Sequence, residues 1–334
     1  MNILILGGTR FVGRHLVDTL LARGHDLTLF NRGQSGPAPA GVALRTGDRR
    51  GDLSALAQGE WDWVLDCCGY LPREVAASAD CLRGRIGRYL FISSISVYAD
   101  FQQPPEEGSP LARLADPQTE QVDGQSYGGL KALCEAALQQ RLGATALALR
   151  PGLIVGPLDP TQRFSYWPAR LARARAGEPI LAPGRPDAPV QWIDARDLAD
   201  FIAQLIESGH PTPPALNVVG PSQPLGVLLA ACAAAAGLDQ PCWRWAAMPR
   251  LEALGLQAWS DLPLALPDTP AWAGFARVDA RAARALGLRC RPTAQTVADT
   301  LAWWRGLPAE QQLFTRAGLS PEREAAALAA LGEA

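Results

Sequence analysis

Short apolar runs alternate with stretches of helical periodicity through the first 155 residues of the chain. The runs predict strands at Asn2–Leu6, Leu27–Phe30, Val42–Leu44, Trp63–Cys67, Tyr89–Ser93 and Thr145–Leu149. Apolar positions in Phe11–Arg23 repeat at helical spacing, and Gly24 follows as a C-cap. Apolar strands that alternate with helices indicate a parallel sheet covered on both faces. We therefore expect an α/β fold with a doubly wound sheet that binds its ligands at the carboxyl ends of the strands.

The pattern changes after residue 155, where prolines become frequent up to about residue 190. Beyond that point the periodicity is mainly helical, with strand candidates at Pro189–Ile193 and Leu216–Val219. This predicts a dinucleotide-binding domain in residues 1–155, rejoined by about 190–220. Residues 156–334 would mainly form a smaller C-terminal substrate domain.

Composition excludes several classes of protein. The 334 residues are 48% apolar, 19% are charged and the net charge is −2, so no basic block predicts binding to nucleic acid. No apolar run reaches the roughly 18 residues of a membrane span, and the opening MNILILGGTRF lacks the cationic start of a signal peptide. Seven cysteines without regular spacing indicate reduced thiols and no metal site. We expect a cytoplasmic enzyme with a small-molecule substrate and no membrane partner, and a homodimer stays open.

A glycine-rich loop follows the first predicted strand and reads Gly7-Gly8-Thr9-Arg10-Phe11-Val12-Gly13. Glycines in a turn between a strand and a helix let the backbone approach a pyrophosphate, which then lies at the positive end of the helix. We therefore predict that all seven residues contact a dinucleotide.

The predicted second strand ends at Asn31-Arg32-Gly33, where NAD-binding proteins carry a carboxylate for the ribose hydroxyls. A carboxylate would repel a 2′-phosphate, whereas a guanidinium binds it bidentately. Asn31 and Arg32, with Arg10 as a second cation, therefore favour NADP over NAD. Asp48 follows the third strand and would accept a hydrogen bond from the adenine amino group, or serve only its own turn.

Tyr127 and Lys131 lie four residues apart on a predicted helix, and Lys131 is the only lysine among 31 basic residues. A tyrosine phenol has a pKa near 10, and a neighbouring ammonium favours the phenolate. Lowering that pKa to about 7 would take roughly 4 kcal/mol and would make Tyr127 an acid/base group. A compact ammonium also suits ribose hydroxyls better than the wide fork of arginine does. Serines at the end of the Tyr89–Ser93 strand would hold the substrate oxygen.

The motifs GGTRFVG, SSISVY and YGGLK, in this order, resemble those of the short-chain dehydrogenase/reductase superfamily. The LRPGLIVGP stretch at Leu149–Pro157 is similar to that of its extended, epimerase/dehydratase-like branch, and the GGxxxxG loop to an atypical subgroup. The resemblance spans about residues 1–220 and implies a Rossmann fold.

The resemblance also implies roles for single residues. Ser94, four before Tyr98, would be the catalytic serine beside Tyr127 and Lys131, and Ser96 a second contact. The cofactor would further contact Cys67, Cys68, Gly69, Pro151 and Gly152.

Two residues of the second domain, Arg163 and Tyr166, are candidates for substrate contacts, because they lie in the segment that begins this domain. The alternative is that this aromatic segment is core.

The pattern as a whole predicts an NAD(P)-dependent oxidoreductase that moves a hydride between the nicotinamide and a carbon bearing an oxygen. An epimerase with a tightly bound cofactor is the first alternative, and a non-catalytic dinucleotide-binding or RNA-associated protein is the second. Ile95 and Ser96 follow Ser94 where sugar 4,6-dehydratases carry Asp-Glu, which disfavours dehydration.

Overall fold

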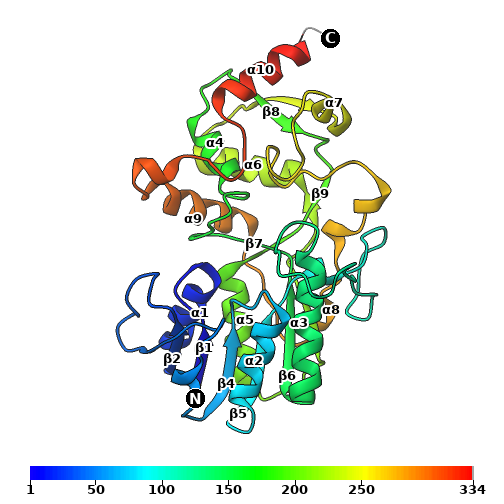
Figure 1. The fold of residues 1–334 in the computed structure, drawn as a ribbon. Coiled ribbons are helices and arrows are strands. Elements are labelled where there is room, and N and C mark those ends of the chain that lie inside the picture. Colours follow the sequence, from blue (N-terminus) through cyan, green and yellow to red (C-terminus); the bar gives the residue numbers. More distant parts are fainter. Residues whose placement is uncertain (333–334) are drawn as a thin grey trace.

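A seven-stranded parallel sheet organises the first half of the protein in the computed structural model, which describes residues 1–332 (Figure 1). Its order is β11-β6-β5-β4-β1-β2-β3. The strands are β1 (Asn2–Leu6), β2 (Asp26–Asn31), β3 (Ala43–Thr46), β4 (Trp61–Asp66), β5 (Ile86–Ile92), β6 (Ala146–Pro151) and β11 (Ala215–Val218). The order reverses between β1 and β4, which is where a doubly wound sheet opens a crevice for its ligand. The predicted fold class is confirmed.

Helices cover both faces of this sheet because its strands are apolar on both sides. In β1, Ile3 and Ile5 lie in a core with α1 (Phe11–Ala22) and α5 (Ala195–Ser208). Leu4 and Leu6 point the other way, into a core with α2 (Pro72–Leu82) and α3 (Tyr127–Leu142).

A second lobe lies beyond the carboxyl ends of the strands (Figure 1). Its core is formed mainly by α4 (Tyr166–Arg173), α6 (Leu225–Ala236) and the segments that pack on them. Phe164, Trp167 and Leu228 are fully or almost fully buried there. The helices of this half are α4 (Tyr166–Arg173), α6 (Leu225–Ala236), α7 (Met248–Ala253), α9 (Thr293–Arg305) and α10 (Pro321–Gly332). The short strands are β7 (Leu153–Val155), β8 (Pro179–Pro183), β9 (Pro189–Val190), β10 (Trp192–Asp194), β12 (Gln223–Pro224) and β13 (Cys242–Ala246). Single turns of 3₁₀ helix lie at Ser54–Leu56, Ile95–Val97, Gly143–Thr145, Pro270–Trp272, Phe275–Arg277 and Ala309–Gln312.

Three features of the second half differ from the pattern-based expectation. The strand expected at Pro189–Ile193 is two short strands, β9 paired with β12 and β10 paired with β7. The parallel pair of β8 and β13 was missed, and β8 begins and ends with proline, which argues against a strand. The segment around α8 (Arg281–Ala285) returns to the first lobe, where Ala283 joins the core under the sheet.

A buried ion pair joins the β3–β4 connection to the end of β4. Arg49 donates to both carboxylate oxygens of Asp66 at 2.7 and 2.9 Å, and the Tyr89 hydroxyl donates to the same carboxylate at 2.8 Å. Burial alone would raise the pKa of Asp66, but the Arg49 charge and these hydrogen bonds hold it below its ordinary value. The pair lies directly beneath Gly69, whose added Cβ would come 3.0 Å from an Asp66 oxygen.

We predict that Arg49→Met lowers the free energy of unfolding by about 3–5 kcal/mol, because it leaves the Asp66 carboxylate buried without its partner. Urea unfolding followed by circular dichroism measures this. Arg50→Met is the matched control, since the Arg50 side chain is 68% exposed beside the same cluster. Equal losses in the two variants would contradict the prediction.

Candidate active site

The glycine-rich loop joins β1 to α1 in a conformation that only small residues allow. Gly7 and Gly8 have φ values of +100° and +88°, and a Cβ on Gly13 would lie 2.7 Å from the Cα of Gly8. Arg10 is the N-cap residue of α1, and its side chain makes no capping hydrogen bond. The first-turn N–H groups therefore face the loop without a side-chain cap, which is the arrangement that binds a pyrophosphate.

The end of β2 is locked to this loop by Asn31. Its side-chain amide donates to the Gly7 carbonyl at 3.2 Å, and its oxygen accepts from the Gly33 N–H at 2.8 Å. Arg10 and Arg32 are exposed, and no hydrogen bond or ion pair engages their side chains within residues 1–332. Asp48 accepts from the Arg50 N–H at 3.0 Å, so it stabilises its own turn.

The end of β4 brings Cys67, Cys68 and Gly69 beside the glycine-rich loop. A Cβ on Gly7 would lie 3.5 Å from the Cys68 sulfur, so the thiols line this part of the loop. Burial raises the pKa of Cys68 to about 11 and that of Cys67 well above its ordinary value. Both thiols therefore stay protonated near neutrality and contribute packing.

Ser94 and Tyr127 come together because the first turn of α3 approaches the Ile95–Val97 turn closely. A Cβ on Gly128 would lie only 2.0 Å from the Ser96 carbonyl oxygen, so no larger residue fits there. Ser94 caps the Ile95–Val97 turn by accepting from the Ser96 N–H, and its hydroxyl donates to the Ser96 hydroxyl at 3.1 Å. The YGG motif thus sets the approach of the tyrosine to the serines.

Lys131 is buried on the same face of α3, one turn after Tyr127. Its ammonium donates to the Gly69 carbonyl at 2.8 Å and to the Ile92 carbonyl at 2.6 Å, and it lies 4.1 Å from the centre of the Phe91 ring. Burial lowers the pKa of Lys131 to about 8. Two of its three N–H bonds are used by these carbonyls, which leaves one for a further acceptor.

The expected lowering of the Tyr127 pKa by Lys131 is not found in the protein alone. Burial raises the pKa of Tyr127 to about 12, and the neighbouring phenol of Tyr70 adds to this. The Ser94 side chain and the positive charge of Arg163 both lower the pKa of Tyr127, but they do not outweigh burial. The Tyr127 phenol is therefore neutral near pH 7.

Several residues that frame this site escaped prediction. The Tyr70 ring lies 6.5 Å from that of Tyr127, and its position just after β4 is the signal that could have found it. Glu135 on α3 accepts from Ser93 at 2.5 Å and pairs with Arg150 of β6 at 2.7 Å. The buried Glu135–Arg150 pair connects α3 to β6, and the Ser93 hydrogen bond connects α3 to the residue just after β5.

Pro151 and Gly152 follow Arg150, and a Cβ on Gly152 would lie 2.8 Å from Val219. This tight contact joins the end of β6 to the residue after β11.

The two second-lobe candidates separate in the structure. Arg163 lies on the loop after β7 and acts electrostatically on Tyr127. Tyr166 is 2% exposed and packs against Trp167 and Phe314 in the core of the second lobe. Tyr166 therefore belongs to the aromatic core, which was the alternative that the sequence left open.

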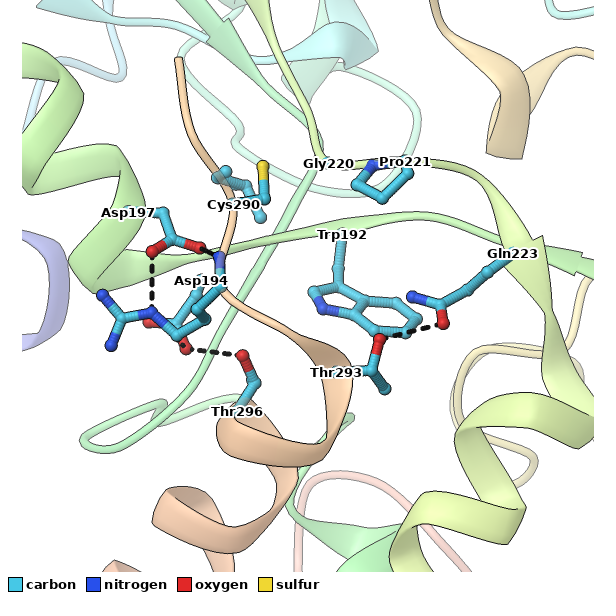
Figure 2. Close-up of a pocket in the computed structure, with 11 residues that line it drawn as sticks. Trp192, Asp194, Asp197, Gly220, Pro221, Gln223, Cys290, Thr293 and Thr296 are labelled. Carbon is cyan, nitrogen blue, oxygen red and sulfur yellow. Dashed lines mark hydrogen bonds and ion pairs between the residues drawn. The ribbon is translucent and has the colours of Figure 1, made fainter. Parts of the chain in front are cut away.

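A small cavity of about 20 Å³ lies where β10, the 220–223 segment and the start of α9 meet (Figure 2). It has room for about one water molecule. Asp194 accepts from the Arg196 N–H at 2.9 Å and from Thr296 at 2.9 Å, and Asp197 pairs with Arg291 at 2.7 Å. These carboxylates cap α5 and hold the two lobes together, so this cavity is not the substrate site.

Comparison with known proteins decides the family. The chain matches the NAD dependent epimerase/dehydratase family over residues 3–69 and 71–218. The chain belongs to this family. None of the helices within residues 1–332 combines the length and the apolar character that crossing a membrane requires.

Individual relatives are more distant. The chain is 29% identical over 262 residues to the chloroplast stem-loop binding protein of 41 kDa b from Arabidopsis thaliana, a match that covers 72% of this chain and 64% of that protein. It is 29% identical over 227 residues to a 2-alkyl-3-oxoalkanoate reductase from Stenotrophomonas maltophilia, covering 61% and 65% of the two chains. The matches thus span just under two thirds of both relatives.

Among solved structures, the UDP-glucose 4-epimerase of Thermus thermophilus in complex with NAD has a TM-score of 0.64 at 20% identity. That match covers 92% of this chain and all of the other. It shows the shared fold.

We predict that Gly128→Ala separates Tyr127 from the serines, because the new methyl group forces α3 away from the Ser96 carbonyl. The expected loss of stability is about 1–3 kcal/mol, with turnover reduced by more than the folded fraction. Gly124→Ala is the control, because a Cβ there meets nothing within 4 Å. Thermal unfolding and steady-state rates measured on both variants check this, and full activity of Gly128→Ala would contradict it.

Proposed function

We propose that the protein is an NADP-preferring oxidoreductase that reduces a ketone carbon to a secondary alcohol. The observation that carries this proposal is the meeting of Ser94 and Tyr127 at the carboxyl edge of the sheet, next to the glycine-rich loop. A nicotinamide bound there would supply the hydride. Family membership supports the dinucleotide, and the reductase named among the relatives supports the direction.

Three side chains, those of Ser94, Tyr127 and Lys131, have separate roles in this reaction. Ser94 donates a hydrogen bond to the substrate oxygen as negative charge develops on it. Tyr127 is protonated because burial raises its pKa to about 12. It gives this proton to the alkoxide that hydride addition creates, which is a stronger base than the phenolate. Lys131 offers its remaining N–H to the ribose hydroxyls and places positive charge near the phenolate left behind.

The preference for NADP rests on the end of β2. No carboxylate follows this strand, the Asn31 side chain is occupied by Gly7 and Gly33, and the exposed guanidiniums of Arg32 and Arg10 have no partner within the described residues. A 2′-phosphate would meet these two cations.

The two alternative functions, an epimerase and an RNA-binding protein, predict different observations. An epimerase must reuse one cofactor in every cycle, so dinucleotide released from the denatured protein in near-stoichiometric amount would favour it over a reductase. The name of the Arabidopsis relative raises RNA binding, which a salt-dependent filter-binding assay with a stem-loop RNA would reveal.

We expect Tyr127→Phe to lower carbonyl reduction by about a hundredfold or more, because the phenolic proton is lost. The variant should still bind NADPH as the wild type does, since the ring remains. A panel of 3-oxo acids, their methyl esters and simple diketones, followed by loss of NADPH absorbance, supplies the substrate. Wild-type turnover by Tyr127→Phe would rule out this mechanism.

A second test concerns the cofactor. Arg32→Asp should weaken NADPH binding by about tenfold or more while leaving NADH nearly unchanged, because a carboxylate repels the 2′-phosphate. Arg14→Met is the control, an arginine of α1 whose side chain pairs with Asp18 at 2.9 Å. Calorimetric titration gives both affinities. A parallel loss of NADH and NADPH binding would remove Arg32 from the specificity argument.

A further inference from the structure

Arg163 is a largely buried cation, and within residues 1–332 no acidic side chain forms an ion pair with it. Its Nε is sealed from solvent with no acceptor, and within residues 1–332 its one hydrogen bond comes from the backbone N–H, to Thr161 at 3.5 Å. Other buried arginines are neutralised, as Arg150 is by Glu135 and Arg170 by Glu324. A buried donor left without an acceptor is costly and calls for an explanation, such as a bound water, ion or ligand.

The nearest carboxylate does not fill that role. Both oxygens of Asp159 are occupied within their own turn, one by the Thr161 N–H at 2.8 Å and the other by the Thr161 hydroxyl at 2.9 Å. Asp159 attracts the Arg163 charge but forms no ion pair with it. The two terminal nitrogens of Arg163 are not sealed as Nε is, so they stay available to an acceptor.

The guanidinium is held in place by stacking. It lies 5.0 Å from the centre of the Trp259 ring, and Phe275 supports that ring edge-on at 5.5 Å. Stacking uses one face of the planar group and leaves its N–H edge free for a bidentate acceptor.

The two loops that form this stack are strained. Within residues 1–332, five non-glycine residues have positive φ values, and four of them lie in these loops: Leu158 and Gln162 in the loop of Arg163, and Trp259 and Leu264 in the other. Each such conformation costs on the order of 1–3 kcal/mol and persists only where the surroundings impose it. The Gln162 side chain supplies this restraint, since it donates to Leu313 O at 2.7 Å and accepts from the Thr315 and Arg316 N–H groups at 2.9 Å.

Arg163 also lies near the proton donor of the site. The loop that carries Arg163 starts after β7 and is tied to α1, because the Pro157 carbonyl lies 2.9 Å from the His15 ring nitrogen. The charge of Arg163 also lowers the pKa of Tyr127.

We propose that Arg163 binds an anionic oxygen group of the substrate, a carboxylate or a phosphate, close to the carbon whose oxygen meets Tyr127. The substrate class is therefore a small anionic ketone or hydroxy compound. This proposal rests on the proposed function for the place of the reacting oxygen, but anion binding itself does not depend on turnover.

The test measures binding to the full-length protein in the presence of NADP⁺ by titration calorimetry. The probes are acetoacetate against its neutral analogue 2,4-pentanedione, and dihydroxyacetone phosphate against dihydroxyacetone. We expect one of the anions to bind, and the arm that binds distinguishes carboxylate from phosphate. Arg163→Met should weaken that anion by about tenfold or more and leave the neutral analogue unchanged.

Arg173→Met is the matched control, because Arg173 also lies over an aromatic ring of the second lobe, at 5.5 Å from Phe314, but is exposed. It should bind the anion as the wild type does. Arg163→Lys checks that a loss of binding in Arg163→Met does not come from misfolding. It keeps the charge and should retain part of the preference for the anion.

Three results would overturn the proposal: no binding of either anion, equal binding by the wild type and Arg163→Met, or a loss of NADP⁺ affinity in Arg163→Met, which would assign the residue to the cofactor. Anion binding that depends on Arg163 without any reduction would uphold the anion site and defeat the proposed function. If the protein reduces neutral ketones and Arg163→Met does not change the rate, the proposed function is upheld and the anion site is defeated.

Discussion

Three elements meet at the buried ammonium of Lys131. From α3 it donates to the carbonyl of Gly69, just after β4, and to that of Ile92 at the end of β5. These carbonyls lie at the carboxyl edge of a parallel sheet, where no neighbouring strand satisfies them. A compact ammonium with three donors reaches both from one helix turn, whereas a planar guanidinium would not fit the same space against Phe91. This geometry explains why a chain rich in arginine keeps one lysine.

Close backbone approach does the rest of the positioning. Gly128 allows α3 to touch the Ser96 carbonyl, and Gly13 allows α1 to touch the glycine-rich loop. Beneath them, the pairs Arg49–Asp66 and Glu135–Arg150 fix the ends of the strands through buried, bidentate contacts. Burial also decides protonation, because it outweighs the local charges and keeps Tyr127 neutral. The first lobe thus holds a neutral phenol between closely packed elements, and Arg163 lies on the loop after β7.

The two lobes contribute different segments to the candidate site. The family match ends at residue 218, so it includes the loop after β7 but not the segment around Trp259. Strained backbone occurs at both places, at Phe11 in the glycine-rich loop and at four residues around the Arg163–Trp259 stack. Strain of this kind is maintained where a particular side-chain direction matters.

The sequence by itself determined the parallel sheet, because the apolar strand runs and the glycine turn are local signals with a fixed period. It also placed Tyr127 and Lys131 on one helix face, since four residues make about one turn. Only the tertiary structure decided which groups surround them. Arg49 pairs with Asp66, Glu135 with Arg150, and Tyr166 turns into a core, all through contacts between distant segments that periodicity does not encode. The protonation of Tyr127 was misjudged for the same reason: spacing along a helix reveals a neighbour's charge, but burial depends on everything packed around it.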